Sequence, residues 1–136
     1  MGNLLGRDEM FWRLGHEKSE QLLEDLRKVE NVNFQDEEGT SYLHVACINH
    51  YAEAVKVLLE MGADPNISDN MGFTPISDVI GRAFDNNAEI LELLLSYGLD
   101  INKQEGYREG DMIVKDLIRS FEDEEYNTIL DKYDNK

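Results

Sequence analysis

The apolar residues of this chain form the same paired pattern in two stretches. In each stretch, two adjacent apolar residues are followed four positions later by a second pair, which places apolar side chains on two stripes of one helix. A helix with two apolar stripes is buried on two sides, so we expect each helix to lie between neighbours in a stack. The pairs are Ala54, Val55, Leu58 and Leu59, repeated 36 residues later as Ile90, Leu91, Leu94 and Leu95.

Glycines around these helices indicate that the two stretches are copies of one repeat. Gly39 and Gly72 lie 33 residues apart, whereas Gly62 and Gly98 lie 36 residues apart. The second copy therefore contains three additional residues, and the matching helix positions place them in the segment 80–87, IGRAFDNN. We expect this longer connection where the first helix of the copy turns into the second.

Two short motifs carry a family resemblance. The segments GFTPI (72–76) and LLEMGADPN (58–66) resemble the ankyrin repeat, a unit of about 33 residues with a Thr-Pro-Leu-His start and a Leu-Leu-x-x-Gly-Ala-Asp-x-Asn end. The match is close over residues 36–103 and loose in both flanks. The resemblance implies an all-α fold, an ankyrin-repeat solenoid of about four helix-turn-helix units, with two full repeats between N- and C-terminal capping units.

The two flanks have the composition of capping units, which turn one polar face to water. Gln21 and Asp25 stand where the repeats carry one apolar stripe, and Asn127 and Asp131 replace the other stripe. We therefore expect a single domain over 1–136. It comprises a cap over about 1–35, a repeat over 36–68, a repeat with the three-residue insertion over 69–103, and a cap over 104–136, with terminal helices near 7–14, 17–28, 111–120 and 123–133.

The turn residues predict where each helix begins and ends. Gly62 and Gly98 suit the left-handed conformation that terminates a helix, where a side chain with a Cβ atom costs about 1 kcal/mol or more. Thr74 and Pro75 suit a helix start, with the hydroxyl capping free N–H groups. Ser41 offers the same cap in the first copy. The segment 103–112 lacks Thr-Pro, so we expect the last hairpin-like finger to differ from the others.

The charge of the chain restricts its partners. The formal net charge is −16, and the stretch between Lys28 and Lys103 holds 13 acids and two bases, a net charge of −11. This field repels nucleic acid and attracts a basic protein. The single cysteine excludes an internal disulfide, and neither a membrane span nor a signal-type leader stands out. We expect a cytoplasmic protein that binds neither nucleic acid nor membranes.

The residues with metal-binding or catalytic chemistry have structural explanations. His44 and Cys47 lie one helical turn apart, a spacing that suits two metal ligands, but the chain has no second cysteine. In the family that the chain resembles, this histidine ties neighbouring loops by hydrogen bonds, and the cysteine position belongs to the core. The acidic runs 36–38 and 122–125 are typical of exposed fingers and helix starts. We expect no catalytic residue, no metal and no cofactor, and we do not predict an enzyme.

Aromatic residues at two places leave alternatives open. Trp12, next to Phe11, is expected in the core of the N-terminal cap, with an exposed binding anchor as the alternative. Arg82 and Phe84 belong to the three-residue insertion. They suit a partner-contact element, because arginine and aromatic residues are enriched in interface hot spots, and they equally suit a simple packed loop.

The resemblance implies that partners bind on the concave side, formed by finger tips and first-helix surfaces. We expect a non-enzymatic module, monomeric when free, that captures a basic protein through electrostatic steering, most specifically as a bacterial immunity protein that neutralises a toxin. A regulatory or adaptor ankyrin-repeat protein that recruits without inhibiting is the first alternative, and a carboxylate- or metal-dependent enzyme is the second. The predicted contact residues are Glu37, Glu38, Thr40, Ile48, Asn49, Asn70, Met71, Phe73, Arg82, Phe84, Tyr107 and Arg108.

Overall fold

The protein is helical over the part that the computed structural model describes, which is the backbone of residues 2–134 and the side chains of residues 7–134. Eight α-helices lie in this range, and its β-type pairings are two isolated bridges, Gln35 with Ser41 and Gln104 with Ile113. None of these helices is long and apolar enough to cross a membrane. They are α1 (Gly2–His16), α2 (Glu20–Leu26), α3 (Tyr42–Ile48), α4 (Ala52–Glu60), α5 (Pro75–Ile80), α6 (Asn87–Ser96), α7 (Val114–Arg119) and α8 (Glu124–Asp134).

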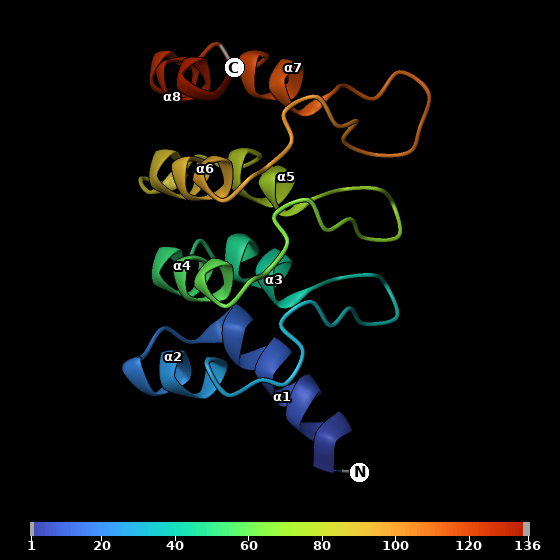
Figure 1. Cartoon of the computed structure of the whole chain (residues 1–136), viewed down its shortest axis with the longest axis vertical. Helices are drawn as coiled ribbons and strands as arrows, with labels where there is room; N and C mark the ends of the chain where they lie inside the picture. Colours follow the sequence, from blue (N-terminus) through green and yellow to red (C-terminus); the bar gives the residue numbers. More distant parts are fainter. Residues whose placement is uncertain (1, 135–136) are drawn as a thin grey trace.

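The helices pair in chain order, and the pairs stack along the long axis of the molecule (Figure 1). α2, α4, α6 and α8 form an outer column and α1, α3, α5 and α7 an inner one, with α4 packed against both α2 and α6. Three long loops project from the inner column, away from the outer helices; we call residues 35–41, 68–74 and 104–113 the first, second and third fingers. The predicted all-α, helix-turn-helix solenoid is confirmed.

The outer helices α4 and α6 hold the centre of the core. All eight residues of the predicted apolar pairs are buried, and six of them have no exposed surface. Burial of one such side chain contributes about 1.5–3 kcal/mol relative to leaving it in water. α4 packs against α2 and α6, and α6 packs against α4 and α8, as the two-stripe pattern predicts.

The helices at the two ends bury one stripe each. In α2 and α8 the apolar member of each pair faces the core, while the polar member is exposed or half-buried. The predicted polarity of the end helices is confirmed at these positions. The buried residues are Leu22, Leu26, Tyr126 and Leu130, and the polar ones are Gln21, Asp25, Asn127 and Asp131.

The bounds of the terminal helices differ from the prediction. α1 begins at residue 2 rather than 7. α2 begins at residue 20 rather than 17, because the hydroxyl of Ser19 caps it by accepting the N–H of Leu22 at 3.1 Å. α7 begins at residue 114 rather than 111, because the third finger still pairs there, with the Glu105 N–H donating to the Met112 carbonyl at 2.9 Å.

The predicted glycine turns and the Ser41 cap are confirmed. Gly62 and Gly98 have φ angles of 98° and 106°, in the left-handed region. Ser41 and His44 form a capping box at the start of α3, in which the Ser41 hydroxyl accepts the His44 N–H at 3.1 Å. The start and the end of a unit are therefore encoded locally.

The start of α5 departs from the prediction. Pro75 occupies the first helical turn, but the Thr74 hydroxyl does not cap the helix. The hydroxyl and the N–H of Thr74 instead both donate to the carboxylate of Glu105, at 3.0 and 2.9 Å, and the Ser77 hydroxyl donates to it at 2.6 Å. Glu105 is 3% exposed, and this burial raises its pKa. A carboxylate from the third finger thus takes the capping role.

Glu105→Ala is expected to lower the free energy of unfolding by about 2–3 kcal/mol, because it leaves the buried N–H of Thr74 without an acceptor. Urea denaturation followed by circular dichroism measures this loss. Glu109→Ala, in the exposed part of the same finger, is the control and is expected to change stability by less than about 0.5 kcal/mol. Equal effects of the two substitutions would contradict the capping role of Glu105.

Candidate partner-binding surface

The first two fingers are the same small hairpin built around an aspartate. The carboxylate of Asp36 accepts the N–H groups two and four residues later, both at 2.9 Å. Asp69 accepts the equivalent N–H groups of Met71 and Phe73 at 2.9 and 3.0 Å. Because these side chains close the loops internally, the finger tips are held in fixed positions before any partner arrives.

The finger tips stack on one another by main-chain hydrogen bonds. The Asn70 N–H donates to the Glu38 carbonyl at 3.0 Å, and the Asn70 side chain donates to the Glu37 carbonyl at 2.8 Å. The Tyr107 N–H donates to the Met71 carbonyl at 3.1 Å. We call these five residues the tip ladder. The structure therefore brings together predicted contact residues from three different units.

Glycines make this close stacking possible. A Cβ atom at Gly39, where φ is 81°, would lie 2.6 Å from the Asn70 nitrogen. A Cβ atom at Gly72, where φ is 88°, would lie 2.6 Å from the Tyr107 ring. Both glycines combine a left-handed backbone with contact to the next finger, so each finger is held against the one that follows.

The residues of the tip ladder and its neighbour Arg108 have exposed side chains. Met71 is 59% exposed and Tyr107 is 70% exposed, while Glu37, Glu38 and Arg108 are also exposed. Asn70 is exposed as well, although its side chain is already engaged in the hydrogen bond to the Glu37 carbonyl. Thr40 and Phe73 are half-buried, and the ring of Phe73 packs next to Gly106.

The His44–Cys47 pair is structural. The Nδ1 atom of His44 accepts the N–H of Ser41 at 3.1 Å, and its Nε2 lies 2.9 Å from the Phe73 carbonyl in the second finger. Burial lowers the pKa of His44 and raises that of Cys47, and Cys47 has no exposed surface. No group of three or more potential metal ligands exists among the residues that the structure describes. His44 ties one unit to the next finger, as the resemblance implies.

Two predicted contact residues lie at the C-terminal end of the inner helix α3. Ile48, at the end of α3, is exposed, whereas Asn49 is half-buried and donates from its side chain to the Leu14 carbonyl in α1 at 2.8 Å. Asn49 therefore joins two units, and Ile48 offers apolar surface next to that joint.

The connection between α5 and α6, which carries Arg82 and Phe84, is partly packed against the preceding unit. It spans residues 81–86, whereas the connection between α3 and α4 spans residues 49–51. The Phe84 ring lies 4.0 Å from the His50 ring, centroid to centroid, yet remains about half exposed. Arg82 is exposed, and its carbonyl accepts a hydrogen bond from the Asn87 side chain. The loop therefore contacts the rest of the protein, while the side chains of Arg82 and Phe84 remain exposed to water.

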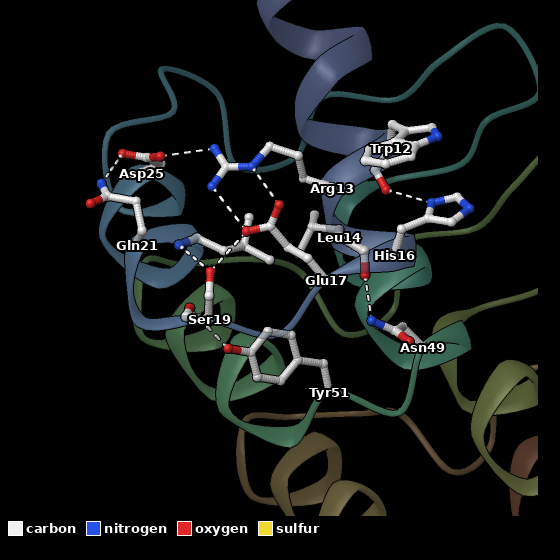
Figure 2. Close-up of polar contacts among 11 residues, drawn as sticks. Trp12, Arg13, Leu14, His16, Glu17, Ser19, Gln21, Asp25, Asn49 and Tyr51 are labelled. Carbon is white, nitrogen blue, oxygen red and sulfur yellow. Dashed lines mark hydrogen bonds and ion pairs between the residues drawn. The ribbon is translucent and has the colours of Figure 1, made fainter.

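The expectation that Trp12 lies in the core is wrong. Met10 and Leu14, four residues apart, are the buried residues of this part of α1, so Trp12, midway between them, faces the opposite side. It is 62% exposed and stacks on His16 at 4.5 Å. Figure 2 shows this pair on the side of α1 away from the Arg13 cluster.

The Arg13 cluster fixes the helix that carries Trp12. The Arg13 guanidinium pairs with Glu17, the residue after the end of α1, at 3.1 Å and with Asp25 in α2 at 2.8 Å (Figure 2). Ser19, which caps α2, donates to Glu17 at 2.8 Å, and its carbonyl accepts the Tyr51 hydroxyl at 3.1 Å. These bonds join α1, α2 and α4, and the exposed face of α1 is positioned accordingly.

Trp12→Ala is expected to change the free energy of unfolding by less than about 0.5 kcal/mol, because the side chain is mostly in water. Phe11→Ala is the matched substitution and is expected to cost about 1–3 kcal/mol, since Phe11 stacks on Tyr42 with ring centroids 4.7 Å apart. Urea denaturation of both variants measures the difference. A large loss of stability on removing Trp12 would place its side chain in the core.

Sequence reasoning missed a half-buried acid on the inner column. Asp78, in α5, makes no side-chain hydrogen bond or ion pair with any described residue. Burial, together with the charges of Asp69 and Glu105, raises the pKa of Asp78 to about 7. The sequence did not indicate that Asp78 is half-buried, because an aspartate in a short helix is usually solvated, even next to buried core residues.

Asp78→Asn is expected to stabilise the protein at pH 8.5 by about 1 kcal/mol or more. Because the folded protein raises the pKa of Asp78, the ionised carboxylate costs free energy above pH 7, and this cost falls as the pH falls. The gain should therefore be smaller at pH 5.5, as measured by urea denaturation at both values. Asp85→Asn, at an exposed position, is the control, and a gain that does not depend on pH would contradict this interpretation.

Comparison with known proteins identifies a family model described as ankyrin repeats, in three copies, over residues 13–105. The human BCL-6 corepressor-like protein 1 is 39% identical over 71 residues, which is 52% of this chain and 4% of that protein. The tyrosine-protein kinase HTK16 of Hydra vulgaris is 40% identical over 78 residues, 57% of this chain and 10% of the kinase. A putative ankyrin repeat protein of Rickettsia bellii is 39% identical over 70 residues, 50% of this chain and 28% of its own length. The chain thus spans less than two thirds of each of these relatives.

Proposed function

Because the chain belongs to the ankyrin-repeat family, whose repeats are protein–protein interaction modules, we propose that it binds a basic protein through the tip ladder and the adjoining face of the inner helices. The observation that carries this proposal is the composition of the tip ladder. Glu37, Glu38, Met71 and Tyr107 are all exposed on successive finger tips, which are joined by the hydrogen bonds of the tip ladder. Carboxylates next to apolar side chains suit a cationic partner with an apolar centre.

The charge distribution supports a basic partner. The stretch between Lys28 and Lys103, which supplies the first two fingers, has a net charge of −11. Asp78 adds a poorly solvated carboxylate that makes no hydrogen bond or ion pair with a described residue, although the charge of Arg82 acts on it from a distance. A cationic side chain near Asp78 would stabilise its ionised form, so part of the cost of this buried charge would be offset on binding.

Apolar contact surface repeats along the inner column. Trp12, Ile48, Phe84 and Phe121 are all exposed, and each lies in the C-terminal part of an inner helix or in the connection that follows it. Four successive units thus offer one large apolar side chain each. Aromatic anchors of this kind contribute most of the free energy in many interfaces, while the charged rim raises the association rate.

The specific form of binding that we propose is inhibition, in which this protein acts as a non-enzymatic, cytoplasmic, monomeric immunity protein and covers a basic toxin. The alternative is an adaptor that recruits a partner without inhibiting it. The relatives favour this alternative, because their matched regions are small parts of proteins named as a corepressor and a kinase. The two forms use the same surface and differ in what happens to the partner's activity.

Replacing both Glu37 and Glu38 by lysine is expected to lower the affinity for the natural partner roughly tenfold or more at low salt. The immobilised protein captures the partner from cells of the source organism, and calorimetry then measures the dissociation constant at several salt concentrations. Affinity of the wild-type protein should fall steeply as salt is added.

A charge-matched control separates the tip ladder from the net charge. Glu53→Lys with Glu60→Lys makes the same change in charge at exposed positions of α4, on the outer column, and should reduce affinity by less than threefold. Unchanged binding of the Glu37 and Glu38 double variant, or equal effects of the two double variants, would contradict the proposal.

Assays of the captured partner distinguish the possible functions. Loss of its enzymatic activity at a one-to-one ratio supports an immunity role, and retained activity in the complex supports an adaptor. Metal bound to the purified protein, together with turnover that depends on pH, would instead support an enzyme.

A further inference from the structure

The outer column contains a second surface that the proposed function does not use. A shallow groove of about 710 Å³ runs between α6 and α8. The fingers project from the opposite side of the stack, so the groove is separate from the tip ladder (Figure 1). It is lined by Ala88, Glu89 and Glu92 of α6 and by Glu124, Glu125, Thr128, Ile129 and Lys132 of α8.

One end of the groove already holds a cation. The Lys132 ammonium lies 2.7 Å from the Glu92 carboxylate, which also accepts a hydrogen bond from the Tyr133 hydroxyl. These two donors, Lys132 first, lower the pKa of Glu92. The contact between Lys132 and Glu92 therefore shows that a cationic group fits next to a carboxylate at this end of the groove.

The rest of the groove has carboxylates without such a partner. Glu89, Glu124 and Glu125 are exposed, and no hydrogen bond or ion pair joins their side chains to any residue that the structure describes. Half-buried Ala88 and the largely buried Ile129 also line the groove and give it an apolar part. A long cationic side chain fits this arrangement, because its aliphatic stem can lie on the apolar part while its head reaches the acids.

We propose that the groove between α6 and α8 is a docking site for an arginine-bearing segment of a protein partner. The planar guanidinium donates several N–H groups in a fixed fork, so it can bind carboxylates from both helices at once, which an ammonium group cannot do as well. The same carboxylates repel nucleic acid phosphates and anionic lipid surfaces. The site stands independently of the tip ladder and of the function proposed for it.

Titration of the ¹⁵N-labelled protein with a hexa-arginine peptide, followed by NMR, tests this proposal. The wild-type protein should show saturable shifts of the amide signals of Ala88, Thr128 and Ile129. The double variant Glu89→Lys with Glu125→Lys should lose at least tenfold in affinity at these signals. Hexalysine should bind the wild-type groove more weakly than hexa-arginine does.

Two controls keep the result specific. Glu53→Lys with Glu60→Lys carries the same net charge as the groove variant and should keep the groove signals within threefold of wild-type affinity. Thr128→Lys, at an exposed position, places a competing ammonium in the groove and should weaken binding in the same direction as the groove variant. Circular dichroism verifies that each variant is folded.

Three outcomes would overturn the proposal. They are equal losses in the groove variant and its charge-matched control, shifts confined to the fingers, and hexa-arginine binding that survives the groove substitutions. The double variant of Glu37 and Glu38 tests the tip ladder alone. If it did not affect binding of the natural partner, the result for the groove would still stand.

Discussion

Two-sided burial of the outer helices is the constraint on which the whole structure depends. α4 and α6 each carry apolar side chains on two stripes, and neither helix can cover both stripes with its own unit. Each therefore requires a unit before it and a unit after it, whereas α2 and α8 carry polar residues in place of one stripe. Local turns decide where a unit stops, but it is this shared burial that makes the units one cooperative structure.

The repeating parts of the fold were predictable because each depends on residues that are close together in the sequence. The apolar pairs of α4 and α6, the left-handed Gly62 and Gly98, and the Ser41 cap depend on neighbouring residues alone. The role of His44 was predictable for a different reason, since the family pattern records a contact between successive fingers. In these places the local preference and the tertiary contact agree.

The parts that sequence reasoning missed depend on contacts across units. Glu105 caps α5 from 31 residues away, which no pattern within α5 reveals. Trp12 lies midway between Met10 and Leu14 along α1, and this spacing places its side chain on the face opposite the core. Several predicted contact residues lie at the finger tips, and both Asn70 and Met71 are exposed there, but only the structure reveals that the Asn70 side chain is engaged in a bond to the Glu37 carbonyl.

Net charge alone does not decide what the two acidic surfaces recognise. At physiological ionic strength the Debye length is about 8 Å, so carboxylates on the fingers and carboxylates on the outer helices act largely separately. The total charge of −16 speeds the approach of any basic protein, whereas selection depends on the few groups within reach of each contact. On the fingers these groups are carboxylates beside exposed Met71 and Tyr107, and between α6 and α8 they are carboxylates beside Ala88 and Ile129. Because the two sets lie on opposite sides of the stack, the two proposed contacts would not block each other.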